Sequence, residues 1–163
     1  MMDTIRELII QEIIARAAVI RTTDSPQAYA TDIGENVFRA CRKVDETNDL
    51  PCIVVWPMVE EAENTHGKSR HKMPLRIEGI AAFGAVNPSV IAERILGDLI
   101  KCFTSPAWDR TRPGSPAPEN YADGIVYQGG GTGEYPDEAS VSIGAGATFL
   151  VTYFTAIGDP YNQ

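Results

Sequence analysis

The sequence predicts an α+β fold, in which a mostly antiparallel sheet with long hairpins is packed by two amphipathic helices. Two segments, near the N-terminus and after Asn87 and Pro88, have apolar residues at helical spacing. Several other segments alternate apolar and polar residues, as half-buried strands do. The last of them, residues 139–157, continues this alternation far beyond the roughly 5–6 residues of an average strand.

Composition limits the class of protein. A chain of 163 residues can bury one sizeable core, so we expect a single domain over residues 1–163. The net charge of −8 disfavours sequence-independent binding of nucleic acid, which needs a basic surface. No apolar run approaches the roughly 18 residues of a membrane span, so neither membrane association nor export from the cytoplasm is expected.

The first helix is expected over residues 3–20. Thr4 and Glu7 have the spacing of a capping box, which satisfies free N–H groups at a helix start, and Asp3 is an equally good cap one residue earlier. Residues 22–34, rich in turn-forming types, are expected to form a loop. The apolar stripe, which predicts that the helix is mostly buried, consists of Ile5, Ile9, Ile13, Ala17 and Ile20.

Strands are expected next. Residues 37–44 alternate between two faces, and residues 52–56 form the continuous apolar run of a strand covered on both faces. Residues 60–72 carry charges of both signs and two histidines, which indicates an exposed hairpin tip. Residues 75–83 alternate again and are expected to form the returning strand.

The second helix starts at Asn87, an N-cap residue, and Pro88, which is favoured at the first helical position. It is expected to end at residues 105–106. The face expected to meet solvent consists of Glu93, Arg94, Asp98 and Lys101.

A long irregular segment separates this helix from the last two strands. Residues 104–123 hold four prolines and little periodicity, which predicts a surface loop. A short strand over residues 125–128 and a flexible glycine-rich connection over residues 129–133 then lead into the final strand.

No residue pattern predicts a metal or phosphate site. The glycines at 129–133 lack the Lys-Ser/Thr of a phosphate loop and precede a strand. His66 and His71 have a spacing that matches no standard pair of metal ligands, so we expect both to be solvated. Adjacent residues on a strand point to opposite faces, so the carboxylates of Glu60 and Glu61 cannot converge on one substrate atom. Both are therefore interpreted as solubilising charge.

The cysteines are not expected to react. Cys41, Cys52 and Cys102 lie inside apolar patterns, which indicates buried and inert thiols rather than nucleophiles or a disulfide framework. The sequence therefore assigns no catalytic, metal or cofactor-binding residue, and the protein is expected to be a non-enzyme without a cofactor.

Subunit contacts are the better-supported use of the remaining residues. Trp, Tyr and Arg anchor protein–protein interfaces, and several lie in segments without periodicity. The alternative for Trp108 is that it folds back over the second helix. The interface candidates are Arg70, His71, Trp108, Arg110, Arg112 and Tyr135.

The order of elements resembles that of the tail terminator and related minor tail proteins of long-tailed bacteriophages and prophages. The resemblance extends over nearly the whole chain and consists of several short segments in the right order. These segments are residues 4–11, 50–55, 60–61, 75–79, 87–88, 149–153 and 158–161.

The resemblance implies a structural protein of the virion tail, assembled in the bacterial cytoplasm. Family members form a ring, typically a hexamer, that stops polymerisation of the tail tube at its head-proximal end. The implied partners are further copies of the chain, the tube and the neck proteins, and no catalytic residues are implied. The loop at 104–123 and the hairpin at 60–72 are long for a minimal member.

Two alternatives remain open at this point. A neck or head–tail completion protein has a similar size and also forms rings. From a different class, a small ligand-binding or hydrolytic α+β enzyme would have a cleft near His66, His71 and the neighbouring glutamates.

Overall fold

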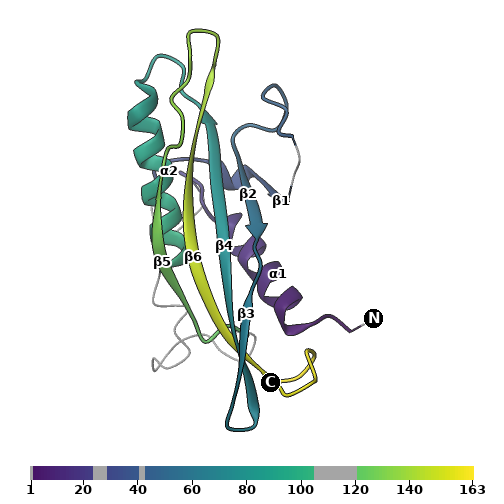
Figure 1. Cartoon of the computed structure of the whole chain (residues 1–163). Coiled ribbons are helices and arrows are strands. Elements are labelled where there is room, and N and C mark those ends of the chain that lie inside the picture. Colours follow the sequence, from purple (N-terminus) through teal and green to yellow (C-terminus); the bar gives the residue numbers. More distant parts are fainter. Residues whose placement is uncertain (1, 24–28, 41–42, 105–120) are drawn as a thin grey trace.

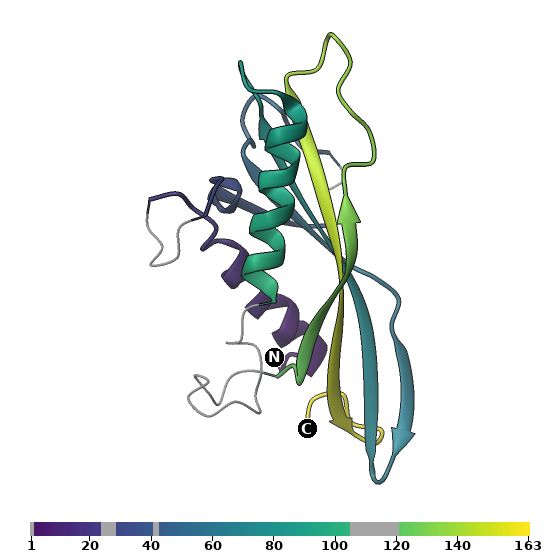
Figure 2. The ribbon, with the colours of Figure 1, turned by 90° about the vertical axis from the view of Figure 1, so that its left-hand side faces the viewer.

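The computed structural model describes residues 2–23, 29–40, 43–104 and 121–163. In these ranges, two α-helices pack on one face of a six-stranded sheet (Figures 1 and 2). The strand order is β1-β2-β4-β6-β5, with β3 paired to β4, and only the β1–β2 pair is parallel. The predicted α+β class is therefore confirmed.

The described elements have the following bounds. The helices are α1 (Ile5–Ala17) and α2 (Pro88–Phe103), and the 3₁₀ turn η1 is Ile33–Glu35. The strands are β1 (Asn36–Arg39), β2 (Cys52–Pro57), β3 (Glu61–Thr65), β4 (Lys68–Ala82), β5 (Gly124–Gly131) and β6 (Ser142–Ala156).

The two longest strands form the centre of the sheet. Strands β4 and β6 pair without a register shift from Lys68 opposite Ala156 to Ala82 opposite Ser142. Every second residue of β6 is buried, which confirms the predicted alternation. In both strands the core residues are odd-numbered, so odd-numbered side chains point to the helices. We call this the helix face, and the uncovered side the open face.

Helix caps lie where the sequence predicts them. The Thr4 hydroxyl accepts a hydrogen bond from the Glu7 N–H at 3.1 Å, which is one half of the predicted capping box. The Glu7 carboxylate instead pairs with Arg39 of β1 at 2.7 Å, and so ties α1 to the sheet. At α2, the Asn87 side chain accepts from the Ser89 N–H at 2.9 Å.

Three predicted boundaries need correction. The segment 60–72 is a regular hairpin, in which only His66 and Gly67 form the turn between β3 and β4, because the two strands stay paired down to it. Strand β1 ends at Arg39 rather than at residue 44, since the next residue takes a positive φ of 46°. Glycines 129–131 belong to β5 and pair with β6.

Asp98 does not face solvent, as the helical pattern predicts, because it is only 5% exposed. Its carboxylate accepts hydrogen bonds from the N–H groups of Ala30 and Thr31, and from the Thr31 hydroxyl at 2.6 Å. A buried carboxylate is stable only with such partners. Asp98 therefore fastens the segment before η1 to α2.

Two of the three cysteines fall within the described residues, and both are buried thiols outside any disulfide, as expected. Burial raises the pKa of the Cys102 thiol to about 11, which keeps it protonated. Cys41 lies outside the described residues. Neither α-helix of the described chain is long and apolar enough to cross a membrane.

The close packing of α2 on the sheet depends on Gly79. A Cβ atom at this position of β4 would lie 2.5 Å from Ile95 Cγ2 and 2.9 Å from Ile33 Cδ1. Both isoleucines are fully buried, so neither side chain has free space into which to move.

We predict that Gly79→Ala lowers the free energy of unfolding by about 1–3 kcal/mol through overpacking. Gly97→Ala is the matched control, because a Cβ on that exposed helical residue meets nothing within 4 Å. That change is expected to raise stability by up to about 1 kcal/mol. Denaturant unfolding followed by circular dichroism measures both, and equal stabilities would contradict the packing argument.

Candidate functional site

The most conspicuous feature of the molecule is an arm, formed by one end of the sheet. Strand β3 and the adjoining ends of β4 and β6 extend past α1 (Figure 2). We define the arm as residues 61–72 and 152–156. All five residues of β3 are exposed. The arm is thus a regular part of the sheet that neither α-helix of the described residues covers.

A one-residue bulge lies at the base of the arm. Strands β2 and β4 stay in register as far as Met58, and pairing of β3 with β4 resumes one residue out of step at Glu61. Two residues, Val59 and Glu60, therefore lie opposite Met73. The extra residue brings Glu60 to the helix face, whereas Val59 projects outward and is 89% exposed.

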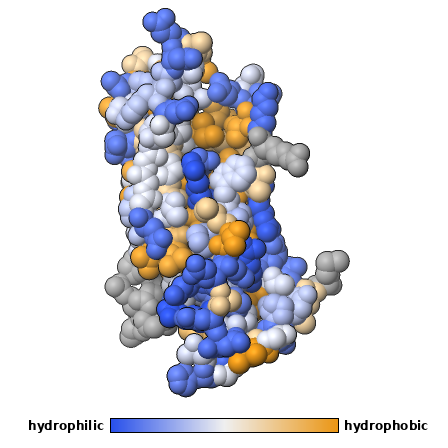
Figure 3. Space-filling view, viewed as in Figure 1, coloured by the Kyte–Doolittle hydropathy of each residue, from blue (hydrophilic) through white to orange (hydrophobic). Residues whose placement is uncertain are grey.

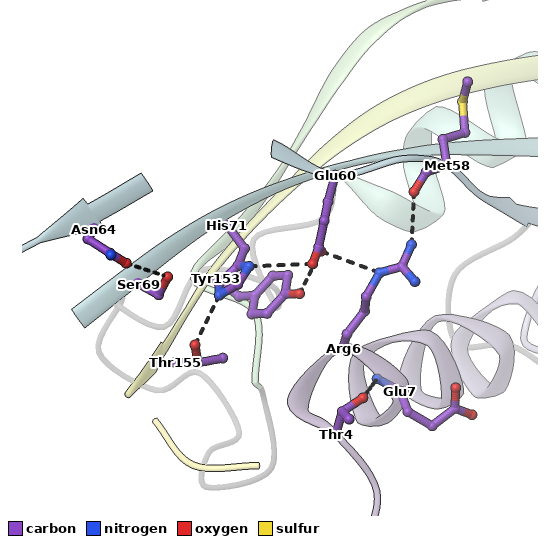
Figure 4. Close-up of polar contacts among 10 residues, drawn as sticks. All are labelled: Thr4, Arg6, Glu7, Met58, Glu60, Asn64, Ser69, His71, Tyr153 and Thr155. Carbon is purple, nitrogen blue, oxygen red and sulfur yellow. Dashed lines mark hydrogen bonds and ion pairs between the residues drawn. The ribbon is translucent and has the colours of Figure 1, made fainter. Parts of the chain in front are cut away.

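Glu60 is the centre of a polar cluster (Figure 4). The Tyr153 hydroxyl donates a hydrogen bond to Glu60 Oε2 at 2.7 Å, and Arg6 Nε of α1 lies 3.3 Å from the same oxygen. His71 Nδ1 lies 3.5 Å from Glu60 Oε1. We call Arg6, Glu60, His71, Tyr153 and Thr155 the arm-base cluster.

His71 is held on two further sides. It lies directly opposite Tyr153 across β4 and β6, and the two rings stack with centroids 4.6 Å apart and planes inclined by 10°. Its Nε2 lies 2.9 Å from the Thr155 hydroxyl. The side chain is only 14% exposed, so the prediction of a solvated His71 is wrong, whereas His66 is exposed as expected.

The arm-base cluster joins the arm to the first helix. The Arg6 guanidinium also donates from Nη2 to the Met58 carbonyl at 2.8 Å, so it contacts the chain on both sides of the bulge. Burial, reinforced by the hydrogen bond to Glu60, raises the pKa of Tyr153 well above its ordinary value of 10. The phenol therefore remains a donor over the physiological range.

The geometry of the arm-base cluster suits a structural connection between the arm and α1 better than a catalytic site. Tyr153 is 2% and Thr155 3% exposed, so neither hydroxyl can meet a substrate in this conformation. Among the residues that the structure describes, no three His, Cys, Asp or Glu side chains are grouped to hold a metal ion. The interpretation of Glu60 as mere solubilising charge is wrong, because the bulge turns it toward these partners.

The predicted interface residues do not form one group. Arg70 lies on the open face of the arm, 3.5 Å from Glu63, and His71 points to the helix face. Tyr135 is 62% exposed and lies in the β5–β6 connection, at the end of the molecule opposite to the arm (Figure 1). Residues 108, 110 and 112, the other three candidates, lie outside the described residues.

Sequence reasoning missed Arg6, Glu60 and Tyr153 as one site. Their positions in the chain are far apart, and the bulge that joins them has no composition signal of its own. The two adjacent glutamates at 60 and 61, which follow an apolar strand, were the one sequence feature that pointed to this site. The sequence matches no protein-family model and no curated protein.

We predict that Tyr153→Phe lowers the free energy of unfolding by about 1–3 kcal/mol near neutral pH, since Glu60 loses a buried donor. The folded-state pKa of Tyr153 lies above the ordinary 10, so its hydrogen bond contributes fully below pH 10 and less as the pH rises above it. The difference between variant and wild type should therefore shrink in alkaline solution.

Denaturant unfolding at a series of pH values measures this difference, and Tyr135→Phe is the control because that ring is exposed. A deficit of Tyr153→Phe that stays constant above pH 10 would show that lost packing, not the hydrogen bond, causes it.

Proposed function

We propose that this chain is a non-enzymatic structural protein of a phage or prophage tail, the tail terminator, which forms a ring at the head-proximal end of the tube. The arm is the observation that carries the proposal. It is long, ordered and exposed along β3. A projecting hairpin with exposed side chains offers a surface to another chain, and its charged residues select a partner of complementary charge, which makes such an arm suited to assembly.

The arm-base cluster supports this use of the arm. A projecting hairpin that moved freely would lose conformational entropy on every contact, which weakens binding. Here the carboxylate of Glu60 connects strands β4 and β6 to helix α1 through His71, Tyr153 and Arg6. The direction of the arm is therefore set before a partner arrives.

Charge also distinguishes the arm from the rest of the chain. The hairpin of the arm together with Glu60 at its base, residues 60–72, contains three glutamates and three lysines or arginines, so the net charge of −8 lies outside this segment. Lys68, Arg70 and Lys72 alternate along β4 and so share the open face. On the same face Lys72 and Arg70 lie opposite Glu61 and Glu63 of β3, whereas Lys68 lies opposite Thr65. Lys68 is therefore the member of the row that does not face a glutamate across the hairpin, and its charge is complementary to an acidic surface of a neighbouring copy.

The hydrolytic alternative rests on one observation, the proximity of His71 and Glu60. The His71 ring stacks against Tyr153 instead of lining an accessible cavity. The hydroxyl groups of Tyr153 and Thr155 beside it are buried. A neck or head–tail completion protein would use the same arm. It would, however, bind at the head side and leave the growth of free tail tubes unchanged.

The proposal predicts closed rings and capped tubes. Light scattering over a concentration series and negative-stain images of the largest species measure the ring. Tubes polymerised from the tail-tube protein of the same phage or prophage should stop growing when the ring is added. Tubes that lengthen unchanged would overturn the terminator role, and rings without this effect would favour the neck protein.

We further predict that Lys68→Glu weakens ring formation, because it reverses the charge at the exposed end of the basic row. Arg94→Glu is the matched control, since Arg94 is an exposed residue of α2, away from the arm. The apparent dissociation constant, measured by light scattering, should rise about tenfold for the first variant only. Equal effects would indicate a response to net charge alone.

A further inference from the structure

An apolar row crosses the open face from one edge of the sheet to the other. Val126 of β5 lies opposite Leu150 of β6, which lies opposite Pro74 of β4. The Pro74 carbonyl accepts a hydrogen bond at 3.1 Å from the N–H of Met58, at the end of β2. Figure 3 shows separate orange patches on this face, some of them near its middle, among white and blue side chains.

Polar side chains lie on both sides of this row. One register step toward the middle of the sheet, Arg76 lies opposite Thr148, and one step toward the arm, Lys72 lies opposite Thr152. On β4 and β6 the apolar row is therefore a narrow band, and strand register places it. At the β2 end, Trp56 lies opposite Arg76 and is next to Met58 on the same face.

The ends of the row are its most exposed parts. Val126 is 61% exposed at one edge, while Met58 is 46% exposed at the other, next to Val59 at 89%. The middle residues, Pro74 and Leu150, are half-buried. Exposed apolar groups thus gather at the two opposite edges, where a neighbouring molecule would meet them.

The edge formed by β5 is also unprotected. Proteins usually blunt exposed strand edges with charged residues or proline. Strand β5 contains neither over its length, Gly124–Gly131. Strand β3, on the opposite edge, carries Glu61 and Glu63. Two copies of β3 would repel each other, whereas β5 can approach another chain without placing like charges opposite.

We propose that the β5 edge of one copy packs against the bulge of the next, with Val126 in contact with Met58 and Val59. This inference rests on the proposed function, and it specifies how neighbouring subunits in the ring join. The two contact regions lie at the same level along the strands, so neighbouring copies are joined with little displacement along the strand direction. A head-to-tail contact of this kind closes into a ring when the rotation between copies divides a full turn, which is the arrangement that the proposed function requires.

A cross-linking experiment tests the contact directly. Val59→Cys and Val126→Cys proteins are treated with a short bis-maleimide, separately and after mixing, with wild type as the control for native thiols. The head-to-tail contact predicts covalent dimers in the mixture and none in either variant alone. Dimers of Val126→Cys alone would overturn it, because they would show two β5 edges packed together.

Charge substitutions give a second readout. Val59→Asp and Val126→Asp should each abolish rings and raise the apparent dissociation constant about tenfold or more, because each places a carboxylate in an apolar contact. Val86→Asp is the matched control, since Val86 is 42% exposed but lies outside the row. Circular dichroism checks that each variant is folded.

Mixing the two Asp variants separates this contact from other arrangements. Each variant keeps one intact edge, so the mixture should form dimers and stop there. Rings that persist in both Asp variants would overturn the inference while leaving the terminator role intact. Tubes that grow unchanged beside wild-type rings, together with the predicted cross-link, would instead overturn the function and leave the contact standing.

Discussion

The continuous pairing of β4 with β6 is the constraint on which the rest of the molecule depends. These strands share one register from the core to the arm, and every other strand except β1 is paired directly to one of them. Their odd-numbered side chains form the floor on which both helices pack, and their far ends form two of the arm's three strands. Core and arm are therefore one ladder of hydrogen bonds.

The bulge between β2 and β3 shows how one residue can create two surfaces. In an unbroken strand, Glu60 would share the open face with Met58, and Val59 would point to the helices. The extra residue shifts this alternation. Glu60 reaches Arg6, His71 and Tyr153, and Val59 is left without cover at the sheet edge. The one-residue bulge therefore produces both the arm-base cluster and the exposed apolar edge.

Local patterns in the sequence predicted what depends on neighbouring residues: both helix caps, the alternation of β6 and the burial of Cys52 and Cys102. They failed where a distant partner decides the outcome. Asp98 occupies a position of α2 that the helical pattern predicts to be exposed. It is buried instead, because residues 30 and 31 pack over it and donate hydrogen bonds to its carboxylate. His71 reads as a loop residue until Tyr153, far along the chain, stacks against it.

The uninterrupted register of the central pair has a mechanical consequence. Paired strands resist sliding, because a shift of one residue would turn every side chain to the wrong face. A load applied at the tip of the arm therefore cannot be absorbed by slippage between β4 and β6. It passes along the two strands as tilt or twist and reaches the floor beneath α2, which belongs to the same ladder of fifteen residue pairs. The protein is therefore expected to behave as a stiff lever, with the arm at one end and the α2 contact toward the other.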